Sequence, residues 1–81
     1  MRKWIVEISW RDPTTDAGWV DEDNHTKKLP ILKSYGILIA ITKTQVIIAG
    51  SYDPDQKKYG DRSKFPKGCV ESIRNIERVK L

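Results

Sequence analysis

The only cysteine of the chain, Cys69, is the first residue to consider as a reactive group. A cysteine nucleophile needs a nearby base and a lowered thiol pKa. The only histidine, His25, lies in an acidic stretch, where neighbouring carboxylates favour the charged imidazolium and make it a poor base. Because Cys69 begins an apolar stretch, we expect it to be a small packing residue rather than a reactive thiol.

A metal site is the second kind of chemistry to test. Asp21, Asp23 and His25 alternate along the chain and could reach one ion, but a calcium loop also needs a glycine at its sixth position and a glutamate at its twelfth. Zinc modules need several Cys or His ligands, and this chain has one of each. The sequence also has no glycine-rich phosphate loop and no clear Ser/His/Asp arrangement. We therefore expect no metal, no cofactor and no enzymatic activity.

The densest group of positive charges lies between residues 57 and 67, and aromatic residues lie among them. Basic side chains bind phosphates and aromatic rings stack on bases, so this mixture is typical of proteins that bind single-stranded nucleic acid. The alternative is a lysine-rich, solvated loop whose aromatic rings pack inward. The nucleic-acid interpretation assigns the site to Lys57, Lys58, Arg62, Lys64, Lys67, Tyr52 and Tyr59.

The overall charge is +4, and it is unevenly distributed. Residues 12–25 contain five acids and no Lys or Arg, whereas residues 26–81 contain twelve Lys or Arg and five acids. A basic surface attracts nucleic acid, although a charged surface also serves solubility alone. Residues 1–11 alternate and lack the apolar segment of a secretory signal, and no apolar run reaches the roughly 18–20 residues that a membrane span needs. We therefore expect an intracellular protein with no membrane partner.

The strands that would position these residues begin near the N-terminus. Residues 3–11 alternate, with Trp4, Val6, Ile8 and Trp10 on one face, which predicts a half-buried strand that ends at Asp12-Pro13. Residues 13–30 form a long acidic connection. Within it, Trp19 is predicted to fold back onto the core, with an exposed binding aromatic as the alternative.

The most apolar segments, residues 37–41 and 46–49, are joined by a turn at residues 43–45 and predict a hairpin, with a bend at Gly36. A strand that is apolar at every position is covered on both faces. In a chain of 81 residues, one face of such a strand would pack against the protein's own core, the interior of a small barrel. The other face would pack against a second subunit. We therefore expect a homo-oligomer, with an interface drawn from Ile37, Ile39, Ile41, Val46 and Ile48.

The C-terminal third contains turn signals at residues 53–55 and 59–61, a short strand at residues 62–65 and a break at Pro66-Lys67-Gly68. Residues 69–76 then predict a bulged fifth strand, with a short helix as the alternative, and residues 77–81 a loose C-terminal tail. Five short strands without a clear helix predict a single all-β domain over residues 1–81, a small antiparallel barrel with a long acidic first loop.

The segment Phe65-Pro66-Lys67-Gly68-Cys69-Val70-Glu71-Ser72-Ile73 resembles the closing segment of SH3-like barrels. The resemblance implies a 3₁₀ turn that begins at the proline, followed by a strand that closes the sheet. Sm-like barrels are the alternative, but they usually begin with a helix. SH3 domains that bind proline-rich peptides usually carry a tyrosine where this chain has Cys69, which argues against that peptide groove.

A second resemblance covers most of the chain. A group of short proteins of tailed phages and prophages has similar residues, in the same order, at positions 6–10, 12, 18–19, 34–38, 46–49, 51, 60–61 and 65–73. The resemblance implies a phage context and no particular chemistry. We therefore expect a binding module in the cytoplasm of an infected or lysogenic bacterial host. Its partner would be single-stranded nucleic acid or, alternatively, a phage or host protein.

Overall fold

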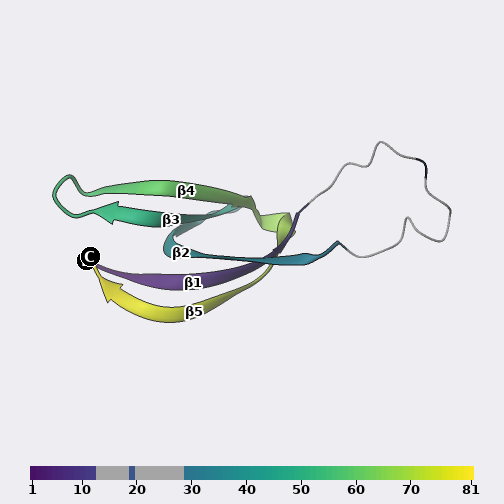
Figure 1. The fold of residues 1–81 in the computed structure, drawn as a ribbon, viewed down its shortest axis with the longest axis horizontal. Helices are drawn as coiled ribbons and strands as arrows, with labels where there is room; N and C mark the ends of the chain where they lie inside the picture. Colours follow the sequence, from purple (N-terminus) through teal and green to yellow (C-terminus); the bar gives the residue numbers. More distant parts are fainter. Residues whose placement is uncertain (13–18, 20–28) are drawn as a thin grey trace.

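The computed structural model describes residues 1–12, 19 and 29–81. Five antiparallel strands form one curled sheet in the order β4-β3-β2-β1-β5 (Figure 1). The prediction of a small, all-β, five-stranded antiparallel fold is therefore confirmed. The sheet does not close, because β4 and β5 are its two edges and are not paired with each other. The elements are β1 (Arg2–Arg11), β2 (Ile31–Ile41), β3 (Gln45–Asp53), β4 (Lys58–Pro66), the 3₁₀ turn η1 (Lys67–Cys69) and β5 (Val70–Lys80).

The core lies on the face of β1 that the alternating pattern predicts. Val6 and Ile8 are 0% exposed, and Trp4 and Trp10 pack against the same cluster. The indole nitrogen Nε1 of Trp10 donates a hydrogen bond of 2.9 Å to Ser34 Oγ on β2, so its polar group is satisfied. The buried residues of the cluster are Val6, Ile8, Val46, Ile48 and Phe65. This core joins β1 to the β3–β4 hairpin.

Strand β2 connects two layers of the sheet. Its first part pairs with β1 and its last part pairs with β3, so it curves from the layer of β1 and β5 to the layer of β3 and β4 (Figure 1). Gly36 lies at this crossing, where a Cβ atom would be 2.7 Å from the backbone oxygen of Ala49. The bend predicted at Gly36 is therefore a point where two strands approach too closely for a side chain.

The two hairpin turns are stabilised by their own side chains. In the β2–β3 turn, Thr42 Oγ1 accepts a hydrogen bond of 3.0 Å from the backbone N–H of Gln45. In the β3–β4 turn, Asp53 Oδ1 accepts one of 2.9 Å from the N–H of Asp55, and Lys57 adopts a left-handed φ of 55°. These are ordinary turn roles for Thr and Asp, and they fix the register of both hairpins.

Strand β4 is longer than the sequence predicts. Residues 59–61, which have the composition of a turn, lie inside β4, where Gly60 pairs with Ser51 and Tyr59 pairs with Tyr52. Asp61 takes a left-handed φ of 53° without ending the strand. The chain reverses at the Asp53 turn instead, so the turn composition at Gly60-Asp61 produces only a local irregularity.

The C-terminal segment confirms the bulged fifth strand. A 3₁₀ turn follows Pro66, and β5 then pairs with β1 with two register shifts. The shift between Ser9 and Trp10 places both Val70 and Ile73, three residues apart, opposite core residues of β1. The prediction of a loose tail at residues 77–81 is wrong. Val79 pairs with Lys3, and the backbone N–H of Leu81 donates a hydrogen bond of 2.8 Å to the oxygen of Met1.

The acidic connection at residues 13–30 lies mostly outside the described residues. At its ends, the Arg11 guanidinium donates a hydrogen bond to the backbone oxygen of Leu29 and an ion pair of 2.6 Å joins Arg11 to Glu71. Trp19 is fully exposed, so the prediction that it packs on the core is wrong. The part of the chain that the structure describes contains no helix long and apolar enough to cross a membrane.

Candidate functional site

The two tyrosines of the predicted nucleic-acid site, and Phe65 on the same strand face as Tyr59, are turned toward the inner side of the β3–β4 hairpin. Phe65 is buried in the core, and its ring centroid lies 5.1 Å from that of Trp10. Tyr52 and Tyr59 are half-buried and pair with each other, with ring centroids 5.0 Å apart. These rings are therefore engaged within the protein and are not arranged as a platform for bases.

The cations of the same predicted site lie on the other face of the hairpin. Arg62 pairs with Ala49 and Lys64 pairs with Ile47, whereas Tyr59 and Phe65 alternate with them along β4. Because successive strand residues point to opposite faces, the positive and aromatic side chains are separated by the sheet. Lys58, Arg62 and Lys64 are exposed, and none forms an ion pair with another described residue.

The other two predicted cations have separate positions. Lys57 lies in the turn between β3 and β4, beyond the paired strands. Lys67 lies in η1, where its Nζ donates a hydrogen bond of 3.2 Å to the backbone oxygen of Thr42. Lys67 therefore helps to tie η1 to the β2–β3 turn, in addition to carrying charge.

The predicted oligomer interface is divided between the core and the surface. Val46 and Ile48 are buried core residues, so they are not exposed for contact with a second subunit. Ile37 and Ile39 are half-buried, and a register shift between Leu38 and Ala40 places Ile39 outside the regular pairing of β2 with β3. Ile41, at the end of β2, is 51% exposed. Among the predicted interface residues, it alone is an exposed large hydrophobic side chain.

The remaining reactive groups of the sequence do not gather into a site within the described residues. Cys69 is a free, partly buried cysteine in η1. Asp21, Asp23 and His25 lie outside the described residues. Residues 1–12, 19 and 29–81 contain no group of three or more His, Cys, Asp or Glu that could hold a metal ion, and no pocket.

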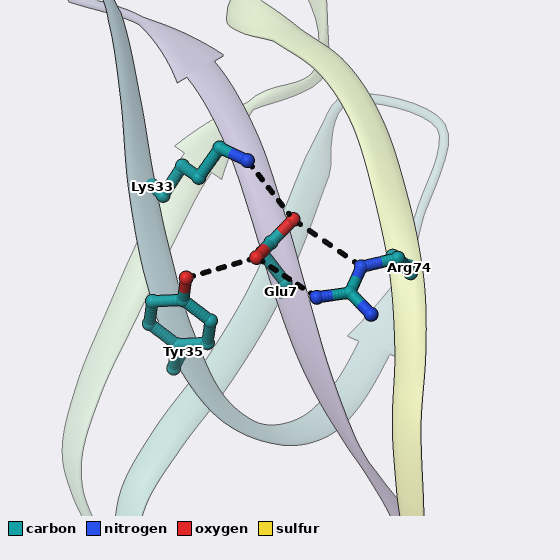
Figure 2. Close-up of polar contacts among 4 residues, drawn as sticks. All are labelled: Glu7, Lys33, Tyr35 and Arg74. Atoms are coloured by element: carbon teal, nitrogen blue, oxygen red, sulfur yellow. Dashed lines mark hydrogen bonds and ion pairs between the residues drawn. The ribbon is translucent and has the colours of Figure 1, made fainter.

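A polar cluster centred on Glu7 lies on the face of β1 opposite the core. Figure 2 shows Glu7 between two neighbouring strands, with Tyr35 and Lys33 on β2 and Arg74 on β5. The Tyr35 hydroxyl donates a hydrogen bond of 2.8 Å to Glu7 Oε2, and Arg74 Nη2 lies 3.1 Å from the same oxygen. Lys33 Nζ lies 3.5 Å from Glu7 Oε1. One carboxylate therefore holds three side chains in place.

The negative charge of this cluster is buried, and its positive charges are exposed to solvent. The Glu7 side chain is only 9% exposed, whereas those of Lys33 and Arg74 are 56% and 65% exposed. The hydrogen bonds from Arg74 and then Tyr35 lower the pKa of Glu7 to about 2, despite the opposing effect of burial. The hydrogen bond to Glu7 also raises the pKa of Tyr35 above its usual value. At neutral pH the carboxylate is charged, the phenol is neutral and the cluster carries one net positive charge.

Sequence reasoning missed this cluster because its members are far apart in the chain. Glu7 alternates with the apolar residues Val6 and Ile8, and the hydrogen-bond partners Tyr35 and Arg74 are 28 and 67 residues away. The signal that could have found it is the mixed face of β1, where a single acid lies among Lys3, Ser9 and Arg11. Only the strand order, with β1 between β2 and β5, identifies Tyr35 and Arg74 as its partners.

Comparison with known proteins finds no matching family model, no matching curated protein and no matching solved structure.

Proposed function

We propose that the protein is a non-enzymatic binding module for single-stranded nucleic acid. We further propose that a phage or prophage encodes it and that it acts in the cytoplasm of the bacterial host. The strand order β4-β3-β2-β1-β5 and the single 3₁₀ turn before β5 support grouping this open sheet with SH3-like small barrels. Among small β-barrels, the OB-fold binds oligonucleotides on one face of its sheet.

The observation that carries the proposal is the cationic face of β4. Lys58, Arg62 and Lys64 are exposed on the same face, and none is neutralised by a described acid. Arg62 and Lys64 are two residues apart on a strand, which separates their Cα atoms by roughly 6.7 Å. They can therefore contact neighbouring phosphates of one nucleic-acid strand, and such contacts release counterions and favour binding.

The double substitution Arg62→Gln with Lys64→Gln is expected to weaken binding to a short, labelled single strand and to reduce its salt dependence. Removing each phosphate contact should make the negative slope of log K against log salt shallower by about 0.7. Fluorescence anisotropy at several salt concentrations measures both effects. Lys43→Gln is the control for loss of one surface charge away from β4, because Lys43 is an exposed lysine on the β2–β3 turn. The proposal fails if the wild-type protein does not bind at low salt, or if the double variant keeps the wild-type slope.

A second candidate is a protein-interaction or assembly module that self-associates or docks on a phage or host protein. The edges of the sheet favour it, since β4 and β5 each have one side without a strand partner among the described residues, and free edges can pair with another chain. Ile41 adds an exposed apolar side chain. Light scattering is expected to show a species larger than the monomer at high concentration, and Ile41→Lys is expected to reduce it. A strict monomer at every concentration would exclude self-association.

A further inference from the structure

We propose that Lys33, Tyr35 and Arg74, arranged around Glu7, form a separate binding site for a nucleotide. The aromatic base would stack on the ring of Tyr35, and the phosphate would contact Lys33 and Arg74. The site lies on β2 and β5, on either side of β1, and does not include the β4 cations. A free nucleotide and a nucleotide within a single strand share this chemistry.

The ring of Tyr35 is exposed and is also held in position. The side chain lies in the middle of the outer sheet face, directly opposite Glu7, and the residue is 57% exposed. Its hydroxyl is fixed by the 2.8 Å hydrogen bond to Glu7, so the exposed part of the side chain is mainly the aromatic ring. An exposed ring with restricted motion suits stacking against a planar base, because little conformational freedom is lost on binding.

The two cations lie against the same carboxylate oxygen of Glu7. Lys33 Nζ lies 3.5 Å from Glu7 Oε1, and Arg74 Nε lies 3.4 Å from the same oxygen. Arg74 directs Nε and Nη2 to Glu7, which leaves Nη1 free to donate to a ligand. The Lys33 ammonium has three N–H donors and directs one of them to Glu7, which leaves two for a ligand. Hydrogen bonds from both cations to phosphate would be charge-assisted and therefore strong.

Glu7 acts as a positioning residue for this site. Its carboxylate is almost buried, whereas the two cations that it orients are mostly exposed. The charge accessible to a ligand at this surface is therefore positive. The cluster keeps one net positive charge after Glu7 is counted, and this charge complements a phosphate. The exposed ring and the oriented cations lie on one face of the sheet (Figure 2).

The experiment titrates the full chain with three probes: adenosine monophosphate, a short deoxyadenosine strand and inorganic phosphate. Tyr35→Leu is expected to weaken binding of the monophosphate or the strand by about tenfold, the range for loss of one stacked base, and to leave the weak binding of inorganic phosphate unchanged. Tyr35→Phe should recover most of the loss, because it keeps the ring. Lys33→Gln should weaken all three probes, and Lys43→Gln serves as its charge-matched control. Chemical-shift changes around β2 and β5 report the location.

The outcomes separate the two proposals. Loss of monophosphate binding in Tyr35→Leu identifies a free nucleotide as a ligand, and loss of strand binding alone identifies a nucleotide within a strand. If Tyr35→Leu binds both as tightly as wild type, or if the wild-type protein binds neither, the inference is overturned. If Tyr35→Leu keeps both monophosphate and strand binding while the β4 double variant loses strand binding, the inference is overturned and the proposed function stays intact. Thermal unfolding checks each fold, and Lys33→Gln provides the test if Tyr35→Leu does not fold.

Discussion

Replacing Gly36 with alanine is expected to destabilise the protein by about 1–3 kcal/mol, the usual range for forcing extra atoms into a packed site. The new Cβ would lie 2.7 Å from the backbone oxygen of Ala49 and 3.1 Å from Ile48 Cδ1. Ala49 cannot easily move away, because it is held between Ile37 on β2 and Arg62 on β4. Chemical denaturation monitored by tryptophan fluorescence measures the change in the free energy of unfolding.

Gly68 provides the matched control for this substitution. A Cβ atom at Gly68 would have no neighbour within 4 Å, and the described glycines have no positive φ. Gly68→Ala is therefore expected to change the free energy of unfolding by no more than about 0.5 kcal/mol. Equal stabilities of the two variants would mean that the close approach of β2 and β3 at Gly36 is not a constraint.

Truncating Ile8 to alanine is expected to lower the free energy of unfolding by about 2–5 kcal/mol. Ile8 is 0% exposed and is the central core residue of β1, opposite Ser34 on β2 and Ile73 on β5. A domain of this size has a total stability of only about 4–12 kcal/mol, so this one change removes a large share of it. The expected result is a clear shift of the denaturation midpoint and, at physiological temperature, a partly unfolded population.

Two further isoleucine variants complete this test. Ile8→Val should lower the free energy of unfolding by only about 0.5–1.5 kcal/mol, because a single methylene is removed. Ile41→Ala removes the same atoms as Ile8→Ala from a residue that is 51% exposed, and it should have a much smaller effect. If Ile41→Ala and Ile8→Ala were equally destabilising, the described core would be wrong.

The parts of the fold that the sequence predicted are those with local signals. Three local signals correspond to observed features: the alternation of residues 3–11, the turn predicted at residues 43–45 and the proline break at Pro66. The turn lies one residue earlier than predicted, because β3 begins at Gln45. The errors occurred where a distant partner overrides local composition. Gly60 and Asp61 remain in a strand because β3 pairs with them, and residues 77–80 are ordered because β1 provides a partner.

The candidate sites show the same limit. Closeness in sequence grouped Arg62 and Lys64 with Tyr59, but strand alternation places the charges and the ring on opposite faces. The Glu7 cluster could not be predicted, since Glu7, Tyr35 and Arg74 come together only when three strands are assembled in one order. Composition correctly indicated a basic protein with aromatic residues, but not which of them lie on one surface.

The pairing of β1 with β5 also affects when the protein can fold during synthesis. One of the two strands that pair with β1 is β5, at residues Val70–Lys80. Lys3, for example, cannot pair with Val79 until β5 has been synthesised. Until the ribosome has released those residues, β1 remains an exposed edge that carries two tryptophans, Trp4 and Trp10. Such distant pairing slows folding, and an unfinished edge favours aggregation. The nascent chain is therefore most prone to aggregation after β1 has been made and before β5 is available to pair with it.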